Sequence, residues 1–246
     1  MPYFENDNAR IYYEIHGEGF PILMLAPGGM RSTIDFWEKV PWNPITQLSS
    51  GYQVIAMDQR NAGHSTAPIS ATDGWQNYTT DQLDLLEHLG IDRFHIVGMC
   101  IGGSFIMGLI QEASERIASA VMFQPIGFDD NGQTFFDLFD DWANEMRPIH
   151  PTVSDDAWLR FRQAMFGGDF LFNVSENFVA QCAVPLLVLM GEDIFHPEVT
   201  SRRVVELAPY AKLIEHWKEP AHIDSAKAAL ESFLTEHTER VMAAEG

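Results

Sequence analysis

The stretch of sequence that decides the fold is a glycine-rich segment near the middle of the chain. Residues 97–104 read Val97-Gly98-Met99-Cys100-Ile101-Gly102-Gly103-Ser104. An apolar, strand-like run precedes it and a helix-compatible run follows it, which is the pattern of a nucleophile on a sharp strand-to-helix turn. Side chains two positions before and two after the nucleophile would collide with neighbouring backbone, so glycine is needed at Gly98 and Gly102. The segment therefore predicts Cys100 as a nucleophile in a strained backbone conformation.

The same turn predicts an electrostatic environment for the thiol. Ile101 offers its backbone N–H at the start of a helix, where a developing oxyanion would be stabilised. The helix end also lowers a thiol pKa and favours the thiolate. Other glycine loops fit poorly, because a phosphate loop needs a lysine that is absent and the dinucleotide fingerprint has a different spacing. A buried structural cysteine is the alternative interpretation of Cys100, and it is the one we adopt for Cys182.

A thiolate nucleophile needs a base and an acid that orients the base. Asp193 follows a strand-like apolar run, and His222 lies after the last such run and before the final helix. We therefore predict a triad of Cys100, His222 and Asp193. Asp129 and Asp130 follow an earlier strand and are the alternative candidates for the acid.

Three other side chains lie in loops near the predicted site. His64 and His196 are expected to be structural or supporting residues rather than catalytic ones. Arg31 either pairs with a substrate carboxylate or, as we expect, forms a surface salt bridge. Neither H-E-x-x-H nor C-x-x-C occurs, so we expect no metal site and no cofactor.

Strand-like and helix-like runs alternate along most of the chain. The expected strands are 10–15, 21–26, 52–57, 94–97, 118–123, 185–190 and 212–215, and the expected helices between them are 80–89, 103–111, 198–207 and 224–241. Such alternation predicts right-handed crossovers and an α/β fold with a mostly parallel sheet covered by helices on both faces.

One region interrupts this alternation. Residues 126–183 contain no convincing strand, but they hold three amphipathic helix candidates (132–145, 155–165 and 175–182) and many aromatic side chains. We expect a small helical lid at 126–183, inserted into a core of 1–125 and 184–246, above the sheet edge where open α/β folds bind ligands. Most lid rings should only pack the insertion against the body. The expected substrate-binding residues are Met30, Met99, Phe128, Phe136 and Trp142.

Composition excludes several classes of partner. The chain has 246 residues and a formal charge of −20, from 35 acidic and 15 basic residues. So few cations argue against nucleic acid and against anionic membrane surfaces. Two cysteines are too few for a disulfide scaffold, and no apolar run approaches the ~20 residues of a membrane span. We expect a cytoplasmic protein that acts on a small molecule with an apolar part, while the oligomeric state stays open.

Taken together, these features resemble the α/β-hydrolase fold family over nearly the whole length. The resemblance rests on the Ala-Pro-Gly-Gly of 26–29, the Cys100 turn, the order nucleophile–acid–histidine, and residues 58–65, which are similar to the family's D-x-R-x-x-G-x-S loop. It implies an oxyanion hole formed by the N–H groups of Ile101 and Gly29, since Pro27 has no N–H to donate. The chain departs from the family in having Pro27 where histidine is usual and Cys100 where serine is usual.

The resemblance also indicates an activity. A cysteine at this turn is similar to that of dienelactone hydrolases and polyhydroxyalkanoate synthases, whereas the 58–65 loop and the lid look more like general ester and enol-lactone hydrolases. The expected function is hydrolysis of ester, lactone or thioester bonds in small apolar substrates through an acyl-thioester. The alternatives are an acyltransferase or C–C lyase on the same scaffold, and a ligand-binding homologue without catalysis. The retained acid and histidine argue against the last of these.

Overall fold

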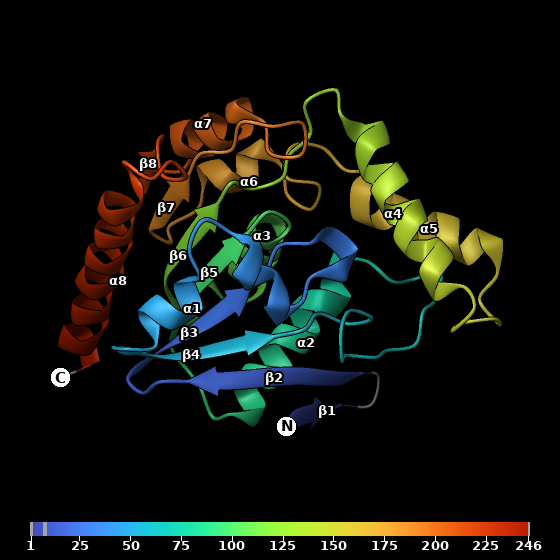
Figure 1. The fold of residues 1–246 in the computed structure, drawn as a ribbon, viewed down its shortest axis with the longest axis horizontal. Helices are drawn as coiled ribbons and strands as arrows, with labels where there is room; N and C mark the ends of the chain where they lie inside the picture. The colour runs from blue at the N-terminus through green and yellow to red at the C-terminus, as the bar shows by residue number, and fades with distance from the viewer. Residues whose placement is uncertain (1, 7–8, 246) are drawn as a thin grey trace.

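The computed structural model describes residues 2–6 and 9–245, and within them eight strands form one sheet (Figure 1). The spatial order is β1-β2-β4-β3-β5-β6-β7-β8. The strands are β1 (Tyr3–Glu5), β2 (Arg10–His16), β3 (Phe20–Leu25), β4 (Tyr52–Met57), β5 (Phe94–Met99), β6 (Ile117–Phe123), β7 (Leu186–Leu189) and β8 (Ala211–Ile214). Strand β2 pairs in antiparallel fashion with both β1 and β4, and β3 through β8 are parallel to one another. The mostly parallel sheet predicted from the sequence is confirmed, with β1 added at its edge.

Helices cover both faces of this sheet, as the sequence predicted. The helical segments outside the β6–β7 connection are η1 (Gly29–Arg31), η2 (Ile34–Lys39), α1 (Pro44–Leu48), α2 (Trp75–His88), α3 (Gly102–Ala113), η3 (Ser114–Arg116), α7 (Glu198–Leu207) and α8 (Ile223–Glu245). Alternate side chains of β3 point to opposite faces of the sheet. Leu23 and Leu25 pack in the core with α2 and α3, whereas Ile22 and Met24 pack with α1 and α8. No helix within the described ranges has the length and apolarity needed to cross a bilayer.

The connection between β6 and β7 holds three further helices, α4 (Gly132–Met146), α5 (Asp155–Phe166) and α6 (Glu176–Ala180). In Figure 1, α4 and α5 lie together at the opposite side of the molecule from α8. Their buried rings meet edge to edge, with Phe139 against Trp142 and Phe161, and Trp142 against Trp158. These contacts join α4 to α5, and the same rings are part of the buried apolar cluster that α2, α3 and the sheet form.

The loop after β4 anchors its surroundings with buried polar groups. The Asp58 carboxylate accepts hydrogen bonds from the backbone N–H of Ile34 at 2.8 Å and of His64 at 2.9 Å. Arg60 and Asp81 form a buried bidentate pair at 2.7 and 2.9 Å, which ties this loop to α2. His64 therefore has the structural setting that the sequence predicted for it.

Candidate active site

Cys100 occupies the turn between β5 and α3 in a left-handed conformation, with φ of 61°. This conformation costs a non-glycine residue roughly 1–2 kcal/mol, and close packing holds it in place. A Cβ at Gly98 would lie 2.8 Å from the carbonyl oxygen of Gly102, and a Cβ at Gly102 would lie 2.8 Å from that of Leu25. The two glycines thus permit the tight turn that presents the sulfur at the carboxyl edge of the sheet.

The surroundings of Cys100 favour its thiolate. Burial acts to raise the pKa of this thiol, but the positive charge of His196, a hydrogen bond from His196 and the N–H groups of Gly28 and Ile101 outweigh it, so the pKa is lowered. Cys182 lacks such partners: burial raises the pKa of its thiol, and its sulfur lies 3.6 Å from the carbonyl oxygen of Val184. The two cysteines therefore differ in ionisation, and only Cys100 lies beside a cation.

His196 lies on the loop between β7 and α7 together with Asp193. Its Nδ1 hydrogen-bonds an Asp193 oxygen at 2.9 Å, and its backbone N–H donates to the other carboxylate oxygen at 3.0 Å. Burial acts to lower the pKa of His196, but Cys100 and Asp193 raise it to about 9. The hydrogen bond from His196 in turn lowers the pKa of Asp193 to about 2. The buried Nε2 has no hydrogen-bond partner of standard geometry among the described residues, and Cys100 acts on this ring because its charge is the largest factor that raises the pKa of His196.

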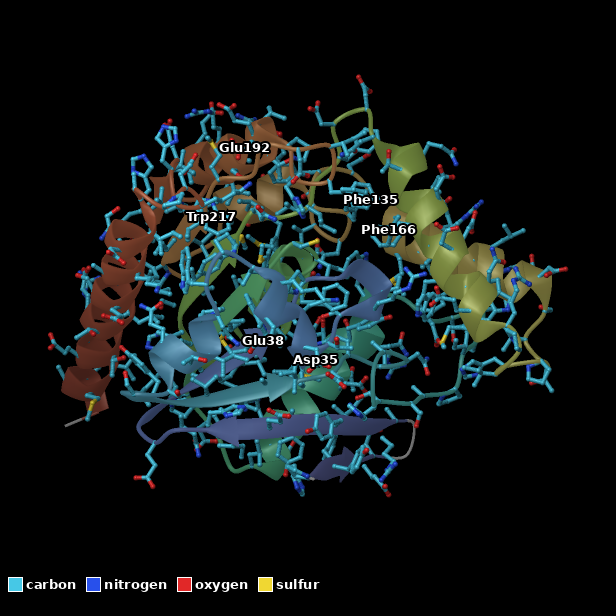
Figure 2. All side chains as sticks on the ribbon, viewed as in Figure 1. Asp35, Glu38, Phe135, Phe166, Glu192 and Trp217 are labelled. Atoms are coloured by element: carbon cyan, nitrogen blue, oxygen red, sulfur yellow. The ribbon has the colours of Figure 1, made fainter. Side chains whose placement is uncertain are left out.

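His222 occupies a different place from the one that the sequence predicted. The chain leaves β8 and is anchored by buried Trp217, whose indole N–H donates to the carbonyl oxygen of Met190 at 2.8 Å (labelled in Figure 2). It then turns outward, so His222 is exposed, with its ring centroid 5.4 Å from that of His216. The structure thus brings Asp193 and His196 to Cys100 and leaves His222 on the surface. His196, which we expected to have a supporting role, is the histidine of the candidate site.

Backbone donors surround the Cys100 sulfur. The N–H groups of Ile101 and Gly28 both act on the thiolate. Gly29, the predicted second donor to an oxyanion, lines the adjacent cavity and adopts φ of 59° at the start of η1. Gly28 directly follows Pro27 and has φ of 121°, a conformation that favours glycine.

An apolar cavity of about 190 Å³ opens beside Cys100. It is lined by Gly28, Gly29, Cys100, Ile101, Ile126, Phe135, Leu138, Phe166, Phe195 and His196. Phe135 and Phe166 lie next to each other beside α4 and α5 in Figure 2, with ring centroids 5.4 Å apart. Helices α4 and α5 therefore contribute to the wall of the cavity that faces the candidate nucleophile.

The five predicted substrate-binding residues lie elsewhere. Met30 of η1 and Trp142 of α4 are buried in one core cluster, and Met99 packs in the other, on the α8 side of the sheet. Phe128 is 44% exposed, and Phe136 lies under the Arg162 guanidinium at 4.8 Å. Adjacent residues of a helix point about 100° apart, which explains why α4 directs Phe135 rather than Phe136 into the cavity.

Charged groups near the site have partners of their own. Arg31 makes two hydrogen bonds to the Glu145 carboxylate, at 2.8 and 3.0 Å, which confirms the predicted salt bridge and links η1 to α4. Asp129 and Asp130, the alternative acids, are exposed and do not line the cavity. Across the described ranges, no group of three His, Cys, Asp or Glu side chains is arranged to hold a metal ion.

Comparison with known proteins found one matching family model and several similar hydrolases. A family model described as "alpha/beta hydrolase fold" matches residues 21–213. A putative carbamate hydrolase of Azorhizobium caulinodans is 36% identical over 122 residues, covering 48% of this chain and 42% of the relative. A carboxylesterase of Bacillus subtilis is 23% identical and covers 77% of this chain and 70% of its own. The chain thus spans about two fifths of the length of the first of these curated relatives.

Solved structures share the fold at low sequence identity. An enol-lactonase from Burkholderia xenovorans superimposes with a TM-score of 0.71 and 19% identity, covering 95% of this chain and 100% of its own. A meta-cleavage product hydrolase from Pseudomonas fluorescens gives a TM-score of 0.68 and 21% identity over 93% of this chain and 95% of its own. At these identities the likeness is one of fold alone.

Proposed function

The chain belongs to the alpha/beta hydrolase fold family, and from that premise we propose that it hydrolyses ester, lactone or thioester bonds with Cys100 as nucleophile. The observation that carries this proposal is the chain of contacts from Cys100 to His196 and from His196 to Asp193, at the wall of an apolar cavity. Relatives named carbamate hydrolase and carboxylesterase support the class of reaction.

The first half of the reaction forms an acyl-enzyme. The Cys100 thiolate attacks the carbonyl carbon of the substrate, and the carbonyl oxygen becomes an oxyanion. This oxyanion takes over the N–H groups of Gly28 and Ile101, which hold the sulfur in the resting enzyme; removing one such donor typically costs about 100- to 1000-fold in rate. Collapse breaks the bond to the leaving group, which receives the Nε2 proton of His196. An acyl-thioester and a neutral His196 remain.

The second half releases the acyl group to water. Neutral His196 accepts a proton at Nε2 from a water molecule as its oxygen attacks the thioester carbon. The tetrahedral intermediate then expels the Cys100 thiolate, which regenerates the ion pair with His196 and liberates the carboxylic acid. Asp193 holds Nδ1 in both halves, so the ring keeps Nε2 towards the sulfur.

The lowered pKa of Cys100 limits the range of leaving groups. A stabilised thiolate departs readily from a tetrahedral intermediate. An alkoxide or amide anion of much higher basicity is expelled more slowly than the thiolate, so the intermediate returns to the substrate. Substrates with a leaving group of thiol-like basicity, such as aryl esters, enol-lactones and thioesters, are therefore favoured over amides.

The test compares variants of the two cysteines with p-nitrophenyl butyrate as substrate. Cys100→Ala should lower kcat/KM by about 10⁴-fold or more, because the nucleophile is gone, whereas Cys182→Ala should keep the wild-type value. A butyryl adduct should appear on Cys100 by mass spectrometry after rapid quenching. Product analysis with added thiol distinguishes hydrolysis from acyl transfer. Retention of more than a tenth of the activity in Cys100→Ala would refute the proposal.

A further inference from the structure

The cavity beside Cys100 offers no counter-charge to an anionic substrate. Among the described residues that line it, Cys100 and His196 alone have polar side chains, and these two are paired with each other. Two arginines of the β3–α1 and β4–α2 connections are also engaged, Arg31 with Glu145 and Arg60 with buried Asp81. A carboxylate placed in the cavity would lose its hydration without gaining a cation, and the thiolate would repel it.

The size of the cavity limits the group that fits. Its volume is about 190 Å³, and a dry protein cavity of about 150 Å³ lined by Leu, Ile and Phe binds benzene. The space therefore accommodates one aromatic ring with one or two further carbon atoms, or a branched chain of similar bulk.

Aromatic contacts hold most of the wall rigidly. Phe135 stacks on Phe166 and meets the edges of Phe172 and Phe195, with centroid separations of 4.6 Å to Phe172 and 5.9 Å to Phe195. Truncating any of these rings would disturb the others, so they are poor candidates for residues that merely set the length of the cavity.

Leu138 of α4 lines the cavity and lies outside this ring cluster. It is half-buried and lies over Gly29, where an added Cβ would come within 2.7 Å of Leu138 Cδ2. Its branches thus close the cavity next to η1, and shortening them leaves the stacked rings in place.

We propose that this cavity binds the acyl part of the substrate, that the acyl group is uncharged and no larger than a ring with one or two further carbons, and that Leu138 sets this limit. The inference rests on the proposed function, because it takes Cys100 as the atom that receives the acyl group. It assigns the apolar part of the substrate to the acyl side of the scissile bond.

Two acyl groups of equal shape test the charge. The 5-methylhexanoyl group has an isopropyl end where the glutaryl group has a carboxylate, and both are supplied as p-nitrophenyl esters with the uncatalysed rate subtracted. The kcat/KM for the glutarate ester should be about 100-fold lower, because its carboxylate is desolvated without a partner. Equal values for the two esters would overturn the charge argument.

A second pair of esters tests the role of Leu138. Wild type should hydrolyse p-nitrophenyl 4-methylbenzoate at least tenfold better than the 4-butylbenzoate, whose tail exceeds the cavity. Leu138→Ala should reduce this ratio to within about threefold, because the removed branches open the closed end. Leu159 is a leucine on α5 with 52% of its surface exposed and outside the cavity lining, so Leu159→Ala is the matched control and should keep the wild-type ratio.

The outcomes separate this inference from the function on which it rests. If wild type forms no acyl-Cys100 with any of the four esters, the proposed hydrolase activity fails. If it forms the adduct but accepts the charged and neutral esters alike, or if Leu138→Ala and Leu159→Ala have the same size ratio as wild type, the activity stands and the acyl-pocket assignment is overturned.

Discussion

Two loops at the carboxyl edge of the sheet each carry a histidine, yet they place it in opposite environments. On the β7–α7 loop, His196 is 8% exposed and is fixed by Asp193 through both its ring and its backbone N–H. On the β8–α8 loop, His222 is exposed, and its backbone N–H bonds the carbonyl oxygen of Glu219 at 2.8 Å in a surface turn. Both histidines have an acid three residues earlier on the same loop, and what distinguishes His196 is that the Asp193 carboxylate bonds its ring and its backbone N–H, whereas the backbone N–H of His222 bonds the main-chain carbonyl of Glu219.

The different environments of His196 and His222 show that the order of residues along the chain does not by itself place a side chain in a site. His222 follows the last strand in the sequential order nucleophile, acid, histidine, but it is exposed, whereas Trp217 earlier on the same loop is buried and bonds the carbonyl oxygen of Met190. His196 comes three residues after the acid, and hydrogen bonds to Asp193 fix its ring and its backbone N–H.

Replacing each histidine in turn tests which of the two acts on Cys100, and it has the largest expected effect. His196→Gln should lower kcat/KM for p-nitrophenyl butyrate by about 10³-fold or more, because the thiolate loses its counter-ion and its base. His222→Gln is the matched variant and should stay within about twofold of wild type, as expected of an exposed side chain away from the sulfur. A large loss in His222→Gln with little change in His196→Gln would show that the loops rearrange in solution and would restore the triad predicted from the sequence.

Removing the charge of the orienting acid should have a smaller effect. Asp193→Asn should lower kcat/KM by about 10- to 100-fold at pH 7, less than the ~10⁴-fold loss for the buried acid of a serine protease, because the Asp193 side chain is 47% exposed. The adjacent Glu192 pairs with Lys218 at 3.3 Å instead, so Glu192→Gln is the control and should leave the rate unchanged. Equal losses in the two variants would indicate a general effect of loop charge.

The pH dependence of alkylation tests the ion pair of Cys100 and His196, and it has the smallest expected effect. Cys100 is charged above its lowered pKa and His196 is charged below about pH 9, so the ion pair exists between these limits and is lost as pH rises through about 9. At pH 6 an ordinary thiol with pKa near 8.5 is only about 0.3% thiolate, so Cys100 should react with iodoacetamide about tenfold faster than such a thiol.

The His196→Gln variant provides the control for that measurement. Without the imidazolium, burial dominates and the midpoint of the alkylation profile should move to higher pH, whereas His222→Gln should keep the wild-type midpoint. The reacted cysteine is identified by peptide mapping, with Cys182 as an internal reference of raised pKa. Identical profiles for wild type and His196→Gln would contradict the ion pair.

The fold could be predicted from the sequence because the patterns that indicate its strands are local and repeated. Buried parallel strands leave continuous apolar runs, so the seven runs found between residues 10 and 215 match strands in the structure to within a few residues. Strand β1 has three residues, too few to leave a pattern. The short helix α1 begins at Pro44 and is capped by Asn43, a proline-after-cap signal that the sequence offers but that the apolar periodicity did not reveal.

The site could be predicted from the sequence only where steric contacts of the backbone require a particular residue type. The glycines around Cys100 follow from van der Waals contact, and they are specific enough to locate the turn. The position of the histidine beside Cys100 follows from how a loop packs, and the three-residue spacing of Asp193 and His196 could not have revealed it, because Glu219 and His222 have the same spacing. The cavity wall depends on which face of α4 turns inward, and a one-residue difference separates Phe135 from the predicted Phe136.

The shared loop of Asp193 and His196 has a mechanical consequence. Two groups three residues apart, joined by both ring and backbone hydrogen bonds, travel as one body when the loop moves. Any displacement of the segment that keeps these bonds preserves the orientation of the imidazole relative to the carboxylate and changes the separation between Nε2 and the sulfur. In the proposed reaction, the position of the loop as a whole therefore sets that separation.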